Sequence, residues 1–306
     1  MIASSGTPGL GLDEFSRVDL RSLLGAAVSF DEPLARRTSM RIGGPAAAFA
    51  VIKNVRDLAA LLRWCKAERR AWTIFGLGSN LLVADAGFPG VAIRLAGDFT
   101  RVVISDTLVS AGAAVPVLAL CREAAKAGLR GAEALVGIPG TVGGAVRMNA
   151  GTDLEIGALV ERVEVMLPGE DARTVATPDF AYRRCSLAPD AVVCGAQLRL
   201  KRGDTKMIGA ELRRRIVQRN ATQPVESPNA GSIFRNPPGD HAARLIETAG
   251  CKGRRIGDAE VSVKHANFIV NRKAATCRDV LALIEDVRAA VERAHGIELQ
   301  LEVHVL

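Results

Sequence analysis

Aromatic side chains are scarce in this 306-residue chain, at 4% with one Tyr and two Trp. A surface that stacks the bases of single-stranded nucleic acid needs such side chains, so we expect no nucleic-acid partner. Long apolar runs are also missing, and no stretch approaches the roughly 20 apolar residues of a membrane span. The start, MIASSGTPGLGLDEF, lacks the basic and apolar regions of a signal peptide. We expect a cytoplasmic protein that does not bind a membrane.

Paired cysteines and metal-ligand clusters are missing as well. No two of the six cysteines have C-x-x-C spacing, and the four histidines suggest no metal set. We therefore expect reduced, mostly buried thiols and no metal.

The charge is basic but spread out. Lys plus Arg is 40 and Asp plus Glu is 33, a net charge of 40 − 33 = +7. The densest basic patch, residues 199–219, is interpreted as a solvated helix face. Small anionic substrates remain compatible with this balance, and the length suggests two domains.

The chain mixes helix and strand signals without a strict βαβ repeat. Helices are expected after Asn54, over 116–128 and over 205–219, and strands at 72–76, 81–85, 91–95, 101–113, 159–167 and 191–201. Thr276 and Asp279 form a capping-box pattern before a helix that ends at Gly296. The closing ELQLEVHV alternates, which predicts a strand with Glu298, Gln300, Glu302 and His304 on its polar face. The pattern favours the α+β class.

Two glycine-rich stretches are candidate cofactor loops. GLGSN (76–80) follows a strand, but Leu81 replaces the third glycine of a dinucleotide fingerprint and no helix follows. The segment 137–151 is too rich in glycine for a regular helix or strand, and such a backbone can approach a flat ligand closely. A strand-connecting turn and a buried connection explain the two stretches equally well.

Three further places could carry chemistry, although each has an ordinary explanation. Tyr182-Arg183 could hold a carboxylate or phosphate, or be a surface turn. Ser232 lies in a small-residue turn without the context of a hydrolase triad. Glu302 and His304 could simply face solvent on a strand edge.

Taken together, these stretches resemble the UDP-N-acetylenolpyruvoylglucosamine reductase family, from about Thr38 to the C-terminus. The order and spacing of the motifs carry the resemblance: TSMRIGGPA (38–46), GLGSNLLV (76–83), GIPGTVGGAVRMNAG (137–151), YR (182–183), NAGSIFRNPPGD (229–240), GDAEVSVKHANFIVN (257–271) and the final LEV. The compact C-terminal region is similar to the shorter type of this enzyme, which lacks an extra substrate-covering loop.

The resemblance implies an α+β fold with an FAD-binding region of the vanillyl-alcohol-oxidase type. We expect a flexible tail at 1–16, an FAD-binding region at 17–203 with subdomains of about 17–95 and 96–203, and a substrate-binding domain at 204–306. The last strand is expected to return towards the flavin site. The residues implied to bind FAD are Gly76, Gly78, Ser79, Asn80, Leu81, Gly137, Pro139, Gly140, Gly143, Gly144, Asn149, Ala150 and Gly151. Because no His precedes His241, non-covalent FAD is expected.

The resemblance also implies a reaction in two halves. NADPH gives a hydride to FAD, and the reduced flavin then passes it to the vinyl carbon of UDP-N-acetylglucosamine enolpyruvate, which yields UDP-N-acetylmuramate for peptidoglycan synthesis. Arg183 matches the family's arginine that stabilises the enolate, Ser232 its proton donor and Glu302 the glutamate that works with the arginine. Tyr182 and Asn236 are expected substrate contacts. The partners are expected to be small molecules, and the protein a monomer.

The chain departs from the family's pattern at two places. Cys185 stands where the family usually has Ser, and GTDLEIG (151–157) is less glycine-rich than expected. Two other functions remain to be weighed. The same fold could carry an oxidase of small alcohols or sugars, which would not react with NADPH. A basic nucleic-acid-binding protein would bind nucleic acid and would be colourless.

Overall fold

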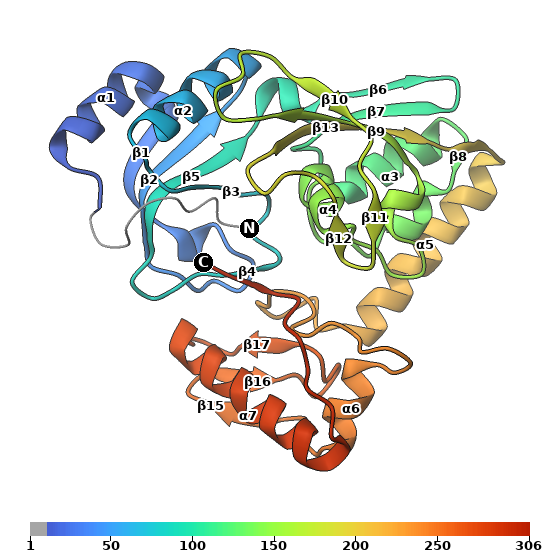
Figure 1. The fold of residues 1–306 in the computed structure, drawn as a ribbon. Coiled ribbons are helices and arrows are strands. Elements are labelled where there is room, and N and C mark those ends of the chain that lie inside the picture. The colour runs from blue at the N-terminus through green and yellow to red at the C-terminus, as the bar shows by residue number, and fades with distance from the viewer. Residues whose placement is uncertain (1–10) are drawn as a thin grey trace. The chain divides into compact units, whose positions relative to one another are not determined.

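The computed structural model describes residues 11–306, and these form two compact units. The first unit contains residues 11–32, Ala46–Gly76 and Pro89–Gln218. The second contains Pro33–Pro45, Leu77–Phe88 and Arg219–Leu306. Each unit therefore combines stretches that lie far apart in the sequence (Figure 1).

The first unit opens with a four-stranded sheet in the order β1-β2-β5-β3. Two helices accompany it, and the second begins at the predicted cap, where Asn54 accepts a hydrogen bond from the backbone N–H of Asp57. The elements are α1 (Glu14–Leu24), β1 (Val28–Pro33), β2 (Pro45–Ile52), α2 (Val55–Ala67), β3 (Trp72–Ile74) and β5 (Phe88–Leu95).

The predicted tail, residues 1–16, falls partly on residues 1–10, which lie outside the described residues. Of the rest, residues from Glu14 onward already belong to α1. The helix begins there because the Asp13 carboxylate accepts a hydrogen bond from the backbone N–H of Ser16 at 2.8 Å.

A second, five-stranded antiparallel sheet has the order β10-β9-β13-β7-β6. Helix α4 packs on β13 and β7 of this sheet (Figure 1). The strands are β6 (Val102–Ser105), β7 (Leu108–Gly112), β9 (Val160–Met166), β10 (Thr174–Ala176) and β13 (Val192–Arg199). The helices are α3 (Val117–Lys126), α4 (Val142–Met148) and α5 (Thr205–Thr222), and the short pairs are β8 (Leu129–Arg130) with β14 (Lys201–Arg202) and β11 (Phe180–Ala181) with β12 (Arg184–Cys185).

The prediction that residues 137–151 hold no regular helix was wrong, since Val142–Met148 form α4. Two glycines lie in this helix, and packing requires one of them. A Cβ on Gly143 would lie 2.8 Å from the Cβ of Ala113, so the helix can approach this neighbour only without a side chain.

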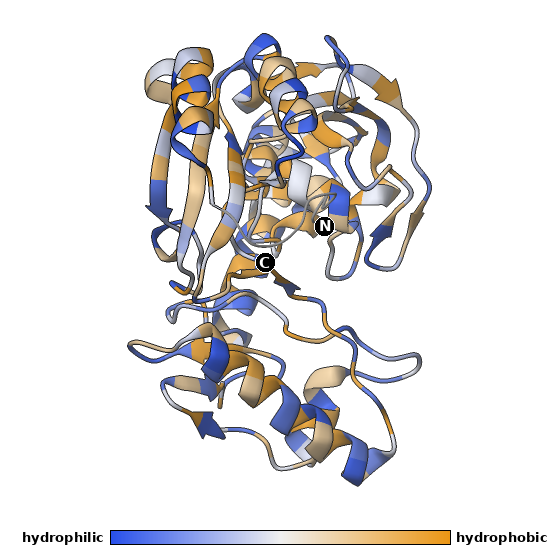
Figure 2. Ribbon diagram, turned by 60° about the vertical axis from the view of Figure 1, so that its left-hand side comes forward, coloured by the Kyte–Doolittle hydropathy of each residue, from blue (hydrophilic) through white to orange (hydrophobic). Residues whose placement is uncertain are grey.

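The second unit carries a three-stranded antiparallel sheet, β15-β16-β17, and two helices. The long helix α7 has the predicted capping box at Thr276 and Asp279 and ends at Gly296 in a left-handed conformation. In Figure 2, α7 alternates hydrophilic and hydrophobic residues, as a helix with one buried face does. The elements are α6 (Ala242–Thr248), β15 (Arg255–Ile256), β16 (Ala259–Val261), β17 (Ile269–Asn271) and α7 (Cys277–His295), with β4 (Leu81–Leu82) parallel to β18 (His304–Val305).

The continuous C-terminal strand predicted over ELQLEVHV is shorter in the structure. Only His304 and Val305 form a strand, β18, while Leu301 makes an isolated bridge to Phe234. The preceding residues pair with an irregular loop at 229–236 instead of a regular strand, which interrupts the ladder.

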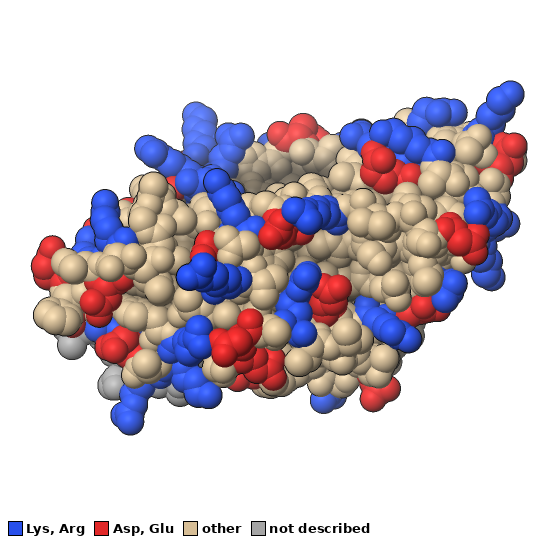
Figure 3. All heavy atoms as spheres, turned by 90° about the horizontal axis from the view of Figure 1, so that it is seen from above, with Lys and Arg blue, Asp and Glu red and all other residues tan. Residues whose placement is uncertain are grey.

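Each unit has its own hydrophobic core. The first core joins residues from Leu12 to Leu212, and the second joins Met40, Ile42 and Leu82 to residues from Ala230 to Val303. All six cysteines are buried and free, as predicted. Within residues 11–306, no helix combines the length and apolar content needed to cross a bilayer. Basic and acidic side chains are interspersed on the face seen in Figure 3.

Candidate active site

Two of the predicted cofactor segments approach each other inside the first unit. Gly76 ends the stretch after β3, and a Cβ there would lie 3.0 Å from Oγ1 of Thr141, the residue before α4. The carbonyl of Gly76 also accepts a hydrogen bond from Nη2 of Arg94 at 3.2 Å. The structure thus places the first residue of GLGSN beside Thr141 of the glycine-rich segment.

The first turn of α4 is bonded to the chain on one side and open at Gly144. The N–H groups of Val142 and Gly143 donate to the carbonyls of Val115 and Ala113, at 2.8 and 2.9 Å. The next residue, Gly144, is exposed, and a Cβ there would come no nearer to another atom than 3.8 Å. The space in front of Gly144 is therefore open, and a flat group can approach the backbone there.

The end of α4 is connected to the Tyr182-Arg183 turn. Asn149 caps α4 with φ of 43° and is 2% exposed. Its Nδ2 donates to Oε2 of Glu155 at 2.6 Å and to the carbonyl of Ala181 at 2.8 Å. Glu155 in turn lies 3.3 Å from Nη1 of Arg183, whose Nη2 donates to the carbonyl of Gly151 at 2.9 Å. The structure therefore brings Asn149, Gly151 and Arg183 together.

The remaining part of GLGSN belongs to the second unit. Gly78 has φ of 65°, and a Cβ there would lie 2.4 Å from the carbonyl oxygen of Arg37, so only glycine fits. Its carbonyl accepts a hydrogen bond from the backbone N–H of Ser39 at 3.1 Å. This contact holds the loop against the TSMRIGG segment.

Ser232 and Glu302 lie on neighbouring backbone segments of the same unit. The N–H of Glu302 donates to the carbonyl of Ile233, the residue after Ser232, at 2.8 Å. Asn80 binds the backbone of Glu302 as well, since its Nδ2 donates to the Glu302 carbonyl at 3.2 Å. A Cβ on Gly231 would lie 3.5 Å from the carbonyl oxygen of Ser79. Ser232, Glu302 and the loop at Ser79-Asn80 therefore form one cluster.

Two buried asparagines that sequence reasoning gave no role hold this cluster. Asn267 donates to the carbonyl of Phe234 at 2.8 Å and accepts from its N–H at 2.9 Å. Asn271 donates to the carbonyl of Met40 at 3.1 Å and accepts from the N–H groups of Lys273 and Ala275. Both lie in the quoted motif KHANFIVN, but only the fold reveals which distant backbone each one pairs with.

The expected substrate contacts lie in different surroundings. Asn236 is exposed, and its side chain accepts a hydrogen bond from the N–H of Ala242 at the start of α6. Tyr182 is 47% exposed, and its ring centroid lies 4.9 Å from Cζ of Arg183.

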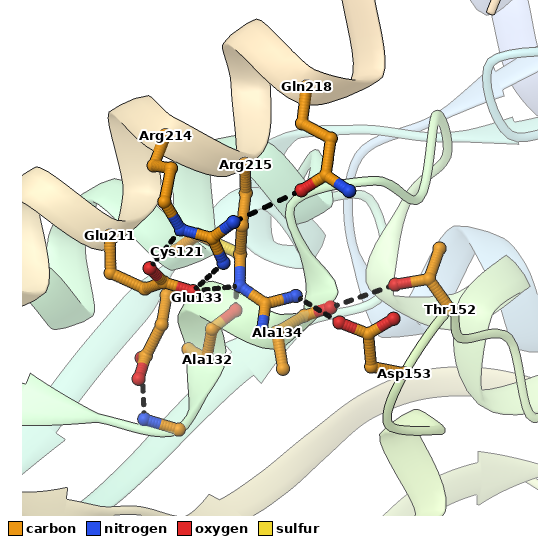
Figure 4. A network of polar contacts seen from close by, with 11 residues as sticks. Cys121, Ala132, Glu133, Ala134, Thr152, Asp153, Glu211, Arg214, Arg215 and Gln218 are labelled. Carbon is orange, nitrogen blue, oxygen red and sulfur yellow. Dashed lines mark hydrogen bonds and ion pairs between the residues drawn. The ribbon is translucent and has the colours of Figure 1, made fainter. Parts of the chain in front are cut away.

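Two basic residues of α5, Arg214 and Arg215, are engaged in ion pairs (Figure 4). Glu211 accepts from both Arg214 and Arg215, and Arg215 also pairs with Asp153 at 2.8 Å. The hydrogen bond from Arg214, followed by that from Arg215, lowers the pKa of Glu211 to about 2. Residues 11–306 contain no cluster of three or more His, Cys, Asp or Glu that could hold a metal ion.

Two family models match the chain. One is described as an FAD binding domain and matches residues 46–175. The other is the C-terminal domain of UDP-N-acetylenolpyruvoylglucosamine reductase and matches residues 223–306.

Similar proteins cover nearly the whole chain. UDP-N-acetylenolpyruvoylglucosamine reductase 2 of Symbiobacterium thermophilum is 43% identical over 285 residues, which is 90% of each chain. The reductase of Heliobacterium modesticaldum is 44% identical over 282 residues, 90% of this chain and 89% of that protein. The crystal structure of the reductase from Thermus caldophilus aligns with a TM-score of 0.77 and 37% identity, over 91% of this chain and 97% of that one.

Proposed function

Because this chain belongs to the UDP-N-acetylenolpyruvoylglucosamine reductase family, we propose that Arg183, Ser232 and Glu302 carry the chemistry of that reaction. The chain is an FAD-dependent oxidoreductase that reduces UDP-N-acetylglucosamine enolpyruvate to UDP-N-acetylmuramate with NADPH, in peptidoglycan precursor synthesis. Its fold is α+β, with an FAD-binding region of the vanillyl-alcohol-oxidase type and a C-terminal domain of this family.

The glycine-rich segments fit a flat cofactor. Open space in front of Gly144 leaves the backbone of α4 accessible, and the close approach of Gly76 to Thr141 joins the two segments. Residues 76–82 would hold the pyrophosphate of FAD, and residues 137–151 would lie near its ring. FAD held there would supply hydride transfer between NADPH and the carbon–carbon double bond of the substrate.

Arg183 would stabilise the negative charge that develops on the substrate. Reduction of the enolpyruvyl group produces an enolate that is delocalised onto the carboxylate. A guanidinium offers several N–H donors in a fixed plane, which suits a carboxylate. Its ordered surroundings, Glu155, Gly151 and Tyr182, support this role, because preorganised donors stabilise developing charge most effectively.

Ser232 would give the proton that completes the reduction at the adjacent carbon, and Glu302 would act on the enol. The observation that carries this assignment is the hydrogen bond from the Glu302 N–H to the Ile233 carbonyl, which fixes the two residues beside each other. A serine hydroxyl is a weak acid, so such fixed placement matters more than pKa.

The change Ser232→Ala tests the proton-donor role. Reduction of bound FAD by NADPH should keep its rate, while reoxidation by UDP-N-acetylglucosamine enolpyruvate should slow by about 100-fold or more, because proton donation is lost. Anaerobic stopped-flow absorbance measures both steps. Ser22→Ala, at an exposed position of α1, is the control. Normal reoxidation in Ser232→Ala would remove Ser232 from the chemistry.

We also propose the remaining predictions of the sequence. Tyr182 and Asn236 would contact the substrate, and the enzyme would act as a cytoplasmic monomer. A domain division into 17–203, with subdomains of about 17–95 and 96–203, and 204–306 is supported by the composition shift near residue 203.

A further inference from the structure

The guanidinium of Arg183 is held from three sides within the first unit. Its Nη1 lies 3.3 Å from Oε1 of Glu155, and its Nη2 donates to the Gly151 carbonyl at 2.9 Å. The Tyr182 ring lies against it, with 4.9 Å from Cζ to the ring centroid. Only 15% of the Arg183 side chain is exposed. Of these contacts, only that with Glu155 brings a full opposite charge.

The carboxylate of Glu155 is itself fixed by a second donor. Its Oε2 accepts from Nδ2 of Asn149 at 2.6 Å, while Oε1 faces Arg183. Asn149 cannot turn its amide around, because Oδ1 accepts from the N–H of Gly157 and Nδ2 also donates to Ala181. Glu155 therefore meets a donor at each oxygen, which a carboxylate can satisfy and an amide cannot.

The loop that carries Glu155 is anchored on its other side. Asp153 pairs with Arg215 of α5 at 2.8 Å, and Oγ1 of Thr152 donates to the carbonyl of Ala134 at 3.4 Å (Figure 4). A Cβ on Gly157 would lie 2.5 Å from Cγ of Phe180, so the loop packs tightly on the Tyr182-Arg183 hairpin. The chain therefore keeps Glu155 in place from two directions.

We propose that Glu155 is a positioning residue that orients Arg183 towards the substrate carboxylate. The proposal rests on the proposed role of Arg183. A negative charge beside Arg183 weakens its attraction for an anionic substrate, so Glu155 gives no advantage in affinity. Its advantage is orientation, since a displacement of about 1 Å at a reacting group can cost on the order of 100-fold in rate.

The deciding variant is Glu155→Gln. Its amide would place an N–H against either Arg183 or Asn149, so the orientation of Arg183 should be lost while the size of the side chain is kept. We expect reoxidation of the reduced enzyme by UDP-N-acetylglucosamine enolpyruvate to slow by about 10- to 100-fold, with the KM of this substrate unchanged or lower. Reduction of FAD by NADPH should keep its rate.

Two further variants complete the series. Glu161→Gln is the matched control, because Glu161 pairs with Arg199 at 2.6 Å on the surface of the same unit. Glu155→Asp keeps both acceptor oxygens but draws them back by one methylene, so it should slow reoxidation less than Glu155→Gln. If Glu155→Gln does not fold with FAD, Glu155→Asp decides, and an unchanged reoxidation rate in it overturns the proposal.

The variant Arg183→Ala distinguishes a failure of the proposed role of Arg183 from a failure of the positioning role of Glu155. If Arg183→Ala leaves reoxidation intact, the proposed function of Arg183 fails. If Arg183→Ala is slow but Glu155→Gln is normal, only the positioning proposal fails. If Glu155 acts through Arg183, adding Glu155→Gln to Arg183→Ala should cause no further slowing. Additive slowing, or a raised KM with an unchanged rate, overturns the proposal.

Discussion

At the scale of single residues, Arg183 combines backbone strain with a rich set of contacts. Its φ of 54° lies in the left-handed region, which costs a non-glycine residue on the order of 1 kcal/mol. Such strain persists where surrounding contacts fix the residue, and here Glu155, Gly151 and Tyr182 do so. A glycine at this position would relieve the strain but would remove the guanidinium. The arginine therefore costs stability, and we expect its function to lie in the reaction.

The buried thiols predict how stability depends on pH. Burial raises the pKa of Cys65 and Cys121 to about 12, whereas an exposed thiol ionises near pH 9. The unfolded chain therefore loses these protons first, and the free energy of unfolding falls as the pH rises from 9 towards 12. Between pH 8 and pH 10 each thiol should account for a loss on the order of 1 kcal/mol.

Urea unfolding at both pH values, for the wild type and for Cys65→Ala, checks this expectation. The free energy of unfolding of the variant should fall less between the two pH values, and the difference from the wild type is the contribution of the Cys65 thiol. The comparison cancels every contribution to the pH dependence that is common to both proteins. Equal losses in the two proteins would contradict the assignment.

Residue roles differed in how far the sequence could predict them. The free thiols follow from cysteine spacing alone, and the capping box at Thr276 follows from a pattern three residues long. The roles of Glu155, Asn267 and Asn271 each depend on one partner that lies at least 28 positions away in the chain, namely Arg183, Phe234 and Met40. No local pattern could have identified them.

At the scale of elements, α4 shows where local propensity misleads. A glycine inside a helix costs about 1 kcal/mol relative to alanine, and α4 has two in seven residues. Tertiary packing outweighs this cost, because the helix lies too close to Ala113 for any side chain at Gly143. The C-terminal segment is the reverse case, since its regular alternation predicts a strand that an irregular partner loop does not support.

Two glycine-to-alanine changes separate the effects of packing and propensity. Gly143→Ala should lower the free energy of unfolding by about 1 to 3 kcal/mol and weaken FAD binding, because the new methyl group overlaps with Ala113. Gly209→Ala in α5 should raise it by about 0.5 to 1 kcal/mol, since the nearest atom is the flexible end of Arg213 at 3.5 Å.

Chemical denaturation of both variants, with flavin fluorescence to follow FAD, provides the measurement. If Gly143→Ala proves as stable as Gly209→Ala, the close packing of α4 on Ala113 does not limit this position.

At the scale of the whole molecule, the units do not follow the order of the sequence. The second unit takes Pro33–Pro45 and Leu77–Phe88 from the first third of the chain and joins them to residues after 218. Composition shifts signal a change near residue 203, but they cannot reveal that earlier segments cross to another core. The motifs predicted the family and its cofactor, because their order along the chain is specific even where each is weak.

Non-covalent attachment of FAD gives a test on the intact protein. The FAD-binding region predicted from the sequence contains no histidine, because the first in the chain is His241, so the usual tethering residue is missing there. Precipitation of the yellow protein with acid should release all the flavin into the supernatant. Flavin that remains with the pellet after washing, measured by absorbance, would show a covalent bond and overturn this expectation. A parallel sample precipitated after addition of free FAD serves as the recovery standard.

The pairing of β18 with β4 has a consequence for synthesis on the ribosome. Leu306 donates to the carbonyl of Leu82, and its own carbonyl accepts from Ala84, so the 81–84 segment is completed by residues that the ribosome adds much later. At about 5 to 20 residues per second, residues 33–45 and 77–88 wait roughly 10 to 40 s for their partners. During translation Met40, Ile42 and Leu82 lack the partners that bury them in the folded chain, so we expect chaperones that bind nascent chains to recognise these segments.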